Sequence, residues 1–353
     1  MISGEFLEID GSFGEGGGSI LRIAAGFSVL FKRPIRITNI RANRPKPGLR
    51  LQHLMGLKTL SLLTGSILSD CTVGTTEIKF DPKNIIKSNI EVEIETAGNI
   101  GLLLQPIQIA CQGFNKPDKI EIFISGGGTF GKWAPSLNYL KNITYEILKN
   151  HGFHIEIDIK KHGFYPKGGA LVKCTLFPPK NNIKPIHLTK LGNLDLIEGD
   201  IVVTNHLKGK SVGERIKKSA QQYLKKYLEL EVSLDFKYVN SLSPGVGLSL
   251  SSRSDTGAII SSGTIVGEKN IRSEDIGKLA AKELIKYIKE NVPVDNYLSD
   301  QLIPFMGFVK EPSKIKVLEL TNHTKTNLEL IKLFLNRNYI VNKQNDHFII
   351  KIQ

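Results

Sequence analysis

One histidine towards the C-terminus is surrounded by residues that favour nucleophilic chemistry. Residues 320–334 read LTNHTKTNLELIKLF and place His323 among hydroxyl and amide side chains. A strand-like segment ends at Leu320, and Thr326 to Glu329 have the T-x-x-E form of a capping box, so we predict a helix that begins near Thr326. His323 would then lie in the strand-to-helix turn, where the positive end of the helix dipole disfavours imidazolium and attracts anions. The pattern indicates either a neutral, nucleophilic imidazole beside a phosphate or a loop histidine with capping neighbours.

A glycine-rich segment near the N-terminus has the composition of an anion-binding turn. Residues 9–24 read IDGSFGEGGGSILRIA, which predicts a strand, a turn and then a helix that opens near Ser19. Glycine lets backbone N–H groups approach a ligand, and a helix N-terminus favours an anion such as phosphate. Glu15 would repel that phosphate unless a divalent cation lies between them, so the segment predicts a metal–phosphate site. The alternative is a tight turn with Glu15 in solvent.

A second segment combines arginines with prolines ahead of a helix. Residues 40–54 read IRANRPKPGLRLQHL, and the side chains of interest are Arg41, Arg44, Lys46, Arg50, Gln52 and His53. Proline lowers the entropy cost of holding several guanidinium groups, and these bind phosphate oxygens bidentately. The segment therefore predicts a clamp for a nucleic-acid phosphate, although a basic surface loop is the alternative. His53 by itself is more often a structural histidine.

Two further segments carry polar side chains whose role is open. Residues 294–307 read VDNYLSDQLIPFMG, in which Asp300 and Gln301 precede an apolar run. They would position a metal-bound phosphate or a base edge, or Ser299 and Asp300 would only cap a helix, which is the commoner case. Residues 162–169, HGFYPKGG, are interpreted as a structural turn between strands.

The remaining pattern predicts an α+β architecture with sheets open on one face. Apolar and polar residues alternate, as in half-buried strands, at 35–40, 90–96, 119–125, 154–160, 170–177, 315–320 and 347–352. Helical periods occupy residues 20–30, 51–63, 137–149, 275–290 and 328–335. A linker-like stretch at 177–187 precedes a new strand–helix–strand set that runs to about Arg272. Its amphipathic helix has an apolar face of Val212, Ile216, Ala220, Tyr223, Leu224 and Tyr227, and its basic face would bind RNA or only be solvated.

Composition limits the class of protein. The chain has 353 residues, with 47 Lys and Arg against 34 Asp and Glu, and its net charge of +13 suits a polyanionic partner or a solvated basic surface. Three separated cysteines predict neither a disulfide framework nor a metal cluster. No apolar run approaches the length of a membrane span and no leader is evident, so we expect a soluble, cytoplasmic protein.

Five segments in order, IDGSFGEGGGSILR, IRANRPKPGLRLQHL, HGFYPKGG, YLSDQL and TNHTKTN, extend over nearly the whole chain. Together they resemble the RNA 3′-terminal phosphate cyclases. The resemblance implies a large catalytic domain, residues 1–185 and 274–353, built from three repeated units of two helices on a four-stranded sheet. Enolpyruvyl transferases share this repeat architecture. A small α/β domain, residues 186–273, would be inserted.

The resemblance also implies a ligase that forms phosphoric ester bonds. ATP would adenylate the active-site histidine with loss of pyrophosphate, and AMP would then pass to an RNA 3′-phosphate. Attack by the vicinal 2′-hydroxyl would give a 2′,3′-cyclic phosphate and release AMP. The expected ligands are ATP, Mg²⁺ or Mn²⁺, and RNA ends bearing a 3′-phosphate, with no membrane or obligate protein partner and with homo-oligomerisation left open. The alternatives are a non-catalytic ribosome-assembly branch, which lacks the histidine, and an enolpyruvyl-transferase-like enzyme.

Residue by residue, the resemblance makes His323 the nucleophile and Glu15 the metal ligand. It implies that ATP is contacted by Arg22, Gln105, Tyr297, Leu298, Ser299, Asp300 and Gln301. It implies that the terminal phosphate of the RNA is contacted by Arg41, Arg44, Gln52 and His53. The chain departs from the family at Ser19, where Gln is common, and at Trp133-Ala134-Pro135-Ser136, where W-S-P-P is common. These departures concern the adenine side of the site and the terminal nucleotide.

Overall fold

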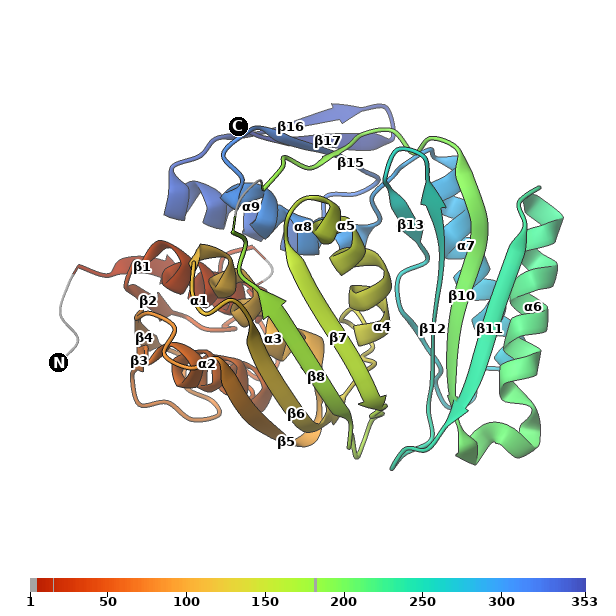
Figure 1. Cartoon of the computed structure of the whole chain (residues 1–353), viewed down its shortest axis with the longest axis horizontal. Helices are drawn as coiled ribbons and strands as arrows, with labels where there is room; N and C mark the ends of the chain where they lie inside the picture. Colours follow the sequence, from red (N-terminus) through yellow and green to blue (C-terminus); the bar gives the residue numbers. More distant parts are fainter. Residues whose placement is uncertain (1–4, 15, 181–182) are drawn as a thin grey trace.

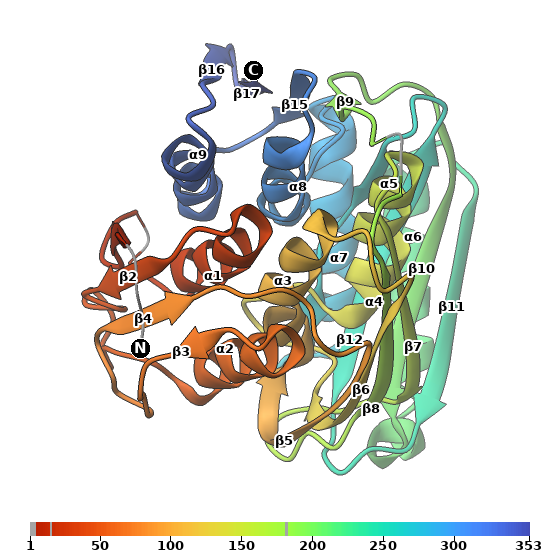
Figure 2. The same ribbon diagram turned by 60° about the vertical axis from the view of Figure 1, so that its left-hand side comes forward.

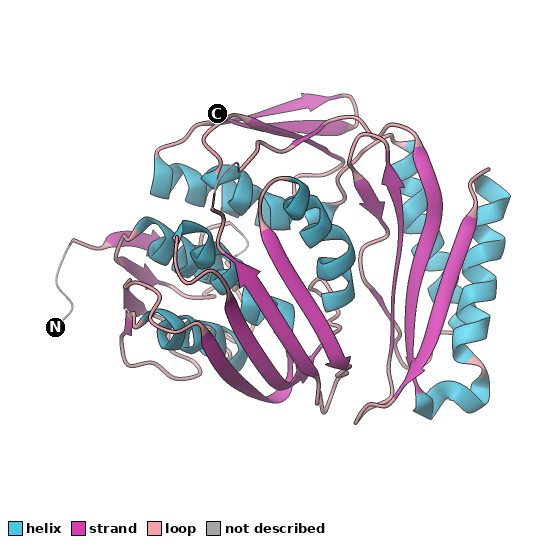
Figure 3. Cartoon of the chain, in the orientation of Figure 1, coloured by secondary structure: helices cyan, strands magenta, loops and turns pink. Residues whose placement is uncertain are grey.

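The computed structural model describes residues 5–14, 16–180 and 183–353, and within these residues helices and strands are mixed along the chain (Figures 1 and 3). The strands of the described residues form three sheets of four strands and one of five. This mixed architecture agrees with the prediction. Among the described residues no helix is both long and apolar enough to span a bilayer.

The first four-stranded sheet has the order β1-β2-β4-β3, and it is covered by two helices. Its elements are β1 (Leu7–Asp10), α1 (Ser19–Phe31), β2 (Ile35–Thr38), α2 (Leu51–Thr64), β3 (Ile67–Leu68) and β4 (Ile78–Asp81). β1 pairs parallel with β2, and α1 is the crossover helix between them. The glycine-rich segment connects the end of β1 to the start of α1. Ser19 is the first residue of α1, as predicted.

The second sheet has the order β5-β6-β8-β7. Its group contains β5 (Asn89–Asn99), α3 (Ile100–Ala110), β6 (Ile120–Gly128), α4 (Leu137–Tyr139), α5 (Tyr145–Asn150), β7 (His154–Lys161) and β8 (Leu171–Phe177). The single helix predicted at 137–149 is interrupted, because Leu140–Thr144 forms a π-helical turn between α4 and α5. Helix α3 was not predicted, since its residues are apolar almost all round and show no amphipathic period.

The third sheet has the order β16-β17-β15-β9 and joins distant parts of the chain. It contains β9 (His187–Leu188), β15 (Ser313–Val317), β16 (Tyr339–Gln344) and β17 (His347–Ile352), with α8 (Asn296–Phe308) and α9 (Asn322–Leu335) beside it. The helices of the three groups face one another and the sheets lie outside them (Figures 1 and 2). Phe27 of α1 packs edge-on against Phe334 of α9, with ring centroids 5.5 Å apart, so the first and third groups share a core.

The five-stranded sheet lies at the other end of the molecule (Figure 1). It consists of β10 (Leu194–Thr204), β11 (Val232–Val239), β12 (Val246–Ser254), β13 (Ile259–Ser261) and β14 (Ile265–Val266), with α6 (Val212–Tyr227) and α7 (Ser273–Lys289) on one face. A second core lies between the sheet and these helices. The predicted amphipathic helix is α6, but the prediction was wrong for Tyr227, which is 42% exposed.

Hydrogen bonds at the start of α4 connect the five-stranded sheet to the second group. Ser136, one of the departures from the family pattern, caps α4 by accepting a hydrogen bond from the backbone N–H of Tyr139 (3.0 Å). Thr264 accepts from the backbone N–H of Ser136 (2.9 Å) and donates to its hydroxyl (3.1 Å). A carboxylate–amide contact between Asp200 and Asn138 lies nearby. These contacts fix the two units relative to each other.

Candidate active site

Helix α9 begins one turn earlier than predicted. Its N-cap is Thr321, whose hydroxyl accepts from the backbone N–H of Thr324 (2.9 Å), whereas Thr326 lies inside the helix and donates to the carbonyl of Asn322 (2.8 Å). The strand before it ends at Val317 rather than Leu320. His323 is therefore the second residue of α9 and not a turn residue, but it still lies at the positive end of the helix dipole.

Asp300 of α8 holds this end of α9 in place. Its carboxylate accepts hydrogen bonds from the hydroxyls of Thr321 (2.5 Å) and Thr324 (2.8 Å), and its backbone carbonyl accepts one from Asn327 (2.9 Å). The prediction that Ser299 and Asp300 cap α8 was wrong. Both lie in the second turn of α8, and the hydroxyl of Ser299 is 3.1 Å from that of Thr324. The two helices are thereby locked together beside His323.

The surroundings of His323 keep its ring neutral. Burial lowers the pKa of His323, Asp300 opposes this, and the positive charges of Arg22 and Arg44 lower the pKa further. Burial also raises the pKa of the Asp300 carboxyl, against the influence of His323 and of the two threonine hydroxyls. The net result is a lowered pKa, which favours the neutral imidazole at neutral pH.

The glycine-rich segment passes between α9, the arginine segment and α2. A Cβ at Gly14, where φ is +65°, would overlap the hydroxyl of Thr326, and Gly16, where φ is +55°, lies against the amide of Asn43. A Cβ at Gly18 would overlap the imidazole of His53. Glycine is required at these positions because the backbone approaches its neighbours so closely. Glu15 lies outside the described residues.

His53 presents an N–H group to the glycine-rich segment. Its Nδ1 atom accepts from the backbone N–H of Arg50 (3.1 Å), so the proton of the neutral ring must be on Nε2, which faces Gly18. Burial, and then the charges of Arg22, Arg41 and Arg50, lower the pKa of His53 to about 2. His53 is therefore a neutral hydrogen-bond donor and not a cation at any ordinary pH.

Arg22 is a buried cation without a carboxylate partner among the described residues. Its side chain is only 6% exposed, and its Nε atom donates to the amide oxygen of Gln105 (2.7 Å). Burial and the nearby charge of Arg41 lower the pKa of Arg22 to about 10, so it stays charged at neutral pH. A buried charge is costly unless it is paired, which makes this position suited to an anionic ligand.

The arginine segment surrounds the same region. Arg41 has a left-handed backbone (φ +55°), and its guanidinium donates to the carbonyls of Lys46 (2.7 Å) and Gly48 (3.1 Å). These bonds hold Arg41 close enough to lower the pKa values of Arg22 and His53. The structure thus groups several predicted residues around the start of α1, α2 and α9, namely His323, Asp300, Arg22, Arg41, Arg44, His53 and Gln105.

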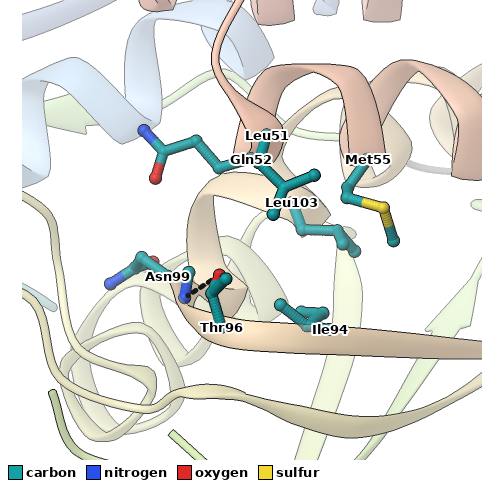
Figure 4. Close-up of a pocket in the computed structure, with 8 residues that line it drawn as sticks. Leu51, Gln52, Met55, Ile94, Thr96, Asn99 and Leu103 are labelled. Carbon is teal, nitrogen blue, oxygen red and sulfur yellow. Dashed lines mark hydrogen bonds between the residues drawn. The ribbon is translucent and has the colours of Figure 1, made fainter. Parts of the chain in front are cut away.

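The other predicted residues lie on the flanks of this group. Gln52, in the first turn of α2, lines a small cavity with Leu51, Met55, Ile94, Thr96, Gly98, Asn99 and Leu103 (Figure 4). On α8, Tyr297 is partly exposed, whereas Leu298 and Gln301 are buried. Leu298 belongs to the core, so any contact it makes with a ligand would come from its backbone.

Asp295 was missed by the sequence interpretation. It is the N-cap of α8 and accepts from the backbone N–H groups of Tyr297 (2.9 Å) and Leu298 (3.0 Å). The hydroxyl of Tyr139 donates to both of its carboxylate oxygens, at 2.8 and 2.7 Å. Tyr139 in turn packs at 6.2 Å, edge to face, against Tyr297. The signal was an aspartate directly before an apolar helix, but Ser299 and Asp300 carried the same signal.

Comparison with known proteins gives a consistent result. A family model described as RNA 3′-terminal phosphate cyclase matches residues 13–341. A protein of that name from Pyrococcus abyssi is 38% identical over 331 residues, which cover 94% of this chain and 94% of that protein. Its namesake from Thermococcus gammatolerans is 37% identical over 337 residues (96% and 94%), and that from Archaeoglobus fulgidus 33% over 345 residues (98% and 100%). The chain therefore belongs to the RNA 3′-terminal phosphate cyclase family.

Proposed function

We propose that the chain is an ATP-dependent RNA 3′-terminal phosphate cyclase with His323 as its covalent nucleophile. The observation that carries this proposal is the pairing of a neutral imidazole at the start of α9 with a buried Arg22 that has no carboxylate partner among the described residues. A nucleophile beside an uncompensated buried cation suits attack on a phosphoanhydride, since the attacking group must be uncharged and the phosphates anionic. The names of the relatives support the cyclase activity as a whole.

The proposed reaction has three steps. A ring nitrogen of His323 attacks the α-phosphorus of ATP, a P–N bond forms, and pyrophosphate leaves. An oxygen of the RNA 3′-phosphate then attacks the same phosphorus, which breaks the P–N bond and gives an RNA-adenylate. Finally the 2′-hydroxyl attacks the terminal phosphorus of the RNA, loses its proton, and expels AMP. The histidine-AMP and the RNA-adenylate are both needed, because the terminal phosphate monoester is a poor electrophile until AMP is attached to it as a leaving group.

In this scheme Arg22, positioned by Gln105, binds the ATP phosphates, and the Asp300–threonine contacts orient the end of α9. We place the rest of ATP against Tyr297, Leu298, Ser299 and Gln301 of α8. Burial of Leu298 leaves it a packing or backbone role. The grouping of these residues around one helix N-terminus is the support for this placement.

We assign Mg²⁺ or Mn²⁺ to Glu15. That residue lies outside the described part of the chain, and the described residues contain no group of three or more His, Cys, Asp or Glu side chains placed to hold a metal ion. The assignment therefore depends on the sequence pattern of the glycine-rich segment. When bound there, a divalent cation would neutralise charge on the ATP phosphates.

For the RNA, we place the terminal phosphate near Arg41, Arg44, Gln52 and His53. The Nε2–H group of His53 would donate to a phosphate oxygen as a neutral group, while the arginines supply the charge. We also infer that the three four-stranded sheets with their helices are repeats of one unit, and that residues 186–273 form an inserted domain. In the structure α7 packs with this unit, and β9 pairs with β15.

The test is covalent labelling. The chain is incubated with ATP radiolabelled at the α-phosphate and with Mg²⁺ or Mn²⁺, and an acid-labile, alkali-stable AMP adduct is expected on the protein. His323→Ala should abolish the adduct, whereas His206→Ala, which changes an exposed histidine near the start of α6, should retain it. If the wild-type chain forms no adduct, or if His323→Ala forms as much, the chain is a non-catalytic RNA-binding protein or carries another activity.

A further inference from the structure

Two aromatic side chains project from the surface on loops near the candidate active site. Trp133 is the only tryptophan in the chain and is 85% exposed, and Tyr165 is 81% exposed. Among the described large apolar side chains these two are the most exposed, followed by Ile86 at 64%. Single exposed apolar residues are normal, so exposure alone indicates no function. Their meaning depends on the rigidity of their loops and on what lies beside them.

The two loops pack against each other. The Trp133 loop (residues 129–136) begins at Thr129, whose backbone N–H donates to the carbonyl of Gly163 in the Tyr165 loop (residues 162–170) at 2.9 Å. Phe130 and Phe164 stack with centroids 5.1 Å apart and ring planes 10° apart. The two loops therefore form one joined surface. Phe130 and Phe164 are buried between them, whereas Trp133 and Tyr165 are exposed to solvent.

The Trp133 loop is also held on its outer side. Gly131 and Ala134 form a β-bridge across it, and the ammonium group of Lys132 forms a salt bridge with Glu268 (2.8 Å). The same ammonium lies 5.5 Å from the centroid of the Trp133 ring. Trp133 is thus an exposed ring on a fixed support, and little further ordering is required when a ligand stacks on it.

A chain of contacts connects this loop to the predicted RNA-binding residues. Gln52 lies beside Gly98, and Asn99 follows Gly98 as the N-cap of α3 (Figure 4). A Cβ at Gly131 of the Trp133 loop would lie 2.8 Å from the Nδ2 atom of Asn99. Figure 4 shows the amides of Gln52 and Asn99 extending to the same side of the cavity residues. Gln52, the buried Asn99 and the Trp133 loop thus lie next to one another in this order.

The amide of Asn99 is incompletely satisfied. Its oxygen accepts from the backbone N–H of Leu102 (3.0 Å), but Nδ2 has no acceptor among the described residues although the side chain is only 8% exposed. A buried amide N–H without an acceptor costs free energy, so such groups are usually completed by water or by a ligand. Asn99 therefore offers a donor between Gln52 and Trp133.

We propose that Trp133 stacks on a base of the RNA strand just upstream of the 3′-terminal nucleotide, with Asn99 donating to the nucleotide between. Tyr165 provides a second aromatic surface on the joined loops. This inference rests on the proposed function, which puts the terminal phosphate near Gln52. Stacking on an aromatic ring accepts any base, so the proposal predicts binding of single-stranded RNA with little sequence preference.

RNA fits this surface better than a protein partner does. An aromatic side chain buries about 150–250 Å², whereas a stable protein interface needs about 800 Å² from each partner. Two basic and exposed residues lie beside the rings, Lys132, which is paired with Glu268, and Lys167. The surface is also continuous with side chains assigned to a phosphate, and the chain carries a net charge of +13.

The experiment compares two RNA ligands that differ only upstream of the terminal nucleotide. Affinities of a 3′-phosphorylated RNA hexamer and of uridine 3′-phosphate are measured for the wild-type chain, Trp133→Ala, Trp133→Phe and, as a matched control, Tyr227→Ala, which removes an exposed aromatic on α6. Trp133→Ala should weaken hexamer binding by about 5-fold to about 150-fold, and should change mononucleotide binding by less than twofold. Trp133→Phe should restore most of the hexamer affinity.

The single tryptophan supplies a second readout, because all of its fluorescence reports on residue 133. The hexamer should quench this fluorescence, and uridine 3′-phosphate should not. The proposal is overturned if Trp133→Ala binds the hexamer as well as wild type does, or if it loses hexamer and mononucleotide equally. Self-association lost in Trp133→Ala with unchanged RNA affinity would mark a protein interface instead. Failure of wild-type adenylation, in contrast, would refute the proposed function and not this surface.

Discussion

Replacing Asp295 by Asn should remove a pH-dependent cost from the folded state. Asp295 is fully buried at the start of α8, where it caps the helix and where the hydroxyl of Tyr139 donates a hydrogen bond shared between its two carboxylate oxygens. Burial raises the pKa of Asp295 from 3.8 to about 7, even though Tyr139 and the backbone N–H groups of Leu298 and Tyr297 act in the opposite direction. In Asn the amide oxygen can still accept the backbone bonds, the NH2 group replaces the second carboxylate oxygen and can donate to the Tyr139 hydroxyl, and the side chain cannot ionise.

The sign and size of the effect follow from proton linkage. Between pH 3.8 and about 7 the folded chain binds more protons at Asp295 than the unfolded chain, so the free energy of unfolding falls as pH rises through this window. A shift of about 3 pKa units corresponds to about 4 kcal/mol in total. Roughly 2–3 kcal/mol of this falls between about pH 5 and about pH 8, where the protein can be studied in its folded form.

The measurement is urea unfolding followed by circular dichroism at several pH values for wild type, Asp295→Asn and an exposed control, Asp235→Asn on β11. The stability of Asp295→Asn relative to wild type should increase by roughly 2–3 kcal/mol from about pH 5 to about pH 8, while the control stays parallel to wild type. Parallel curves for Asp295→Asn and wild type would refute the reasoning. They would mean that Asp295 has the same pKa in the folded and unfolded chains.

Three further predictions concern the candidate active site directly. Arg22→Gln should slow adduct formation by about 10²–10³-fold at saturating ATP, because it removes a buried charge from the phosphates; a change within twofold would contradict this. Since burial and two arginines lower the pKa of His323, the adenylation rate should not be halved on going down to pH 6.5, and a midpoint at or above pH 6.5 in the rate profile would contradict a neutral ring. Gly18→Ala should abolish adduct formation because its methyl group would overlap His53, whereas Gly209→Ala, with nothing within 4 Å, should retain it.

The sequence predicted the type of most elements but not the position of α9. Two capping signals overlap there, Thr321 followed by Thr324 and Thr326 followed by Glu329. Thr321 is the actual cap because its hydroxyl also donates to Asp300, a contact between residues 21 positions apart that no local pattern reveals. A local rule therefore located the helix to within one turn, and a tertiary hydrogen bond determined its first residue.

The environment of Arg22 was also set by tertiary contacts that the sequence does not reveal. The glycine-rich and arginine-rich segments each indicated phosphate, but the partner of Arg22 is Gln105, which is 83 residues away and lies on a helix that was not predicted. That Arg22 is buried, and that it meets an amide and not a carboxylate among the described residues, could only be learned from the structure. The sequence supplied the candidates, and the packing determined which of them share one environment.

The helices around the candidate site differ from α5, α6 and α7 in the charges at their N-termini. The first turns of α1, α2, α3 and α9 contain no acidic residue, whereas α8 has the carboxylate of Asp295 as its N-cap. In contrast, α5, α6 and α7 carry Glu146, Glu214, Glu274 and Asp275 in their first turns. An acidic residue there stabilises a helix by about 0.3–1 kcal/mol, so its absence from these four helices is a cost to the folded chain. A polyanionic ligand bound at these ends would offset that cost. Burial is the main cause of the low pKa of His53 and of the lowered pKa of His323, and the charge of Arg22 lowers both further, so both rings are neutral without any contribution from bound ligand.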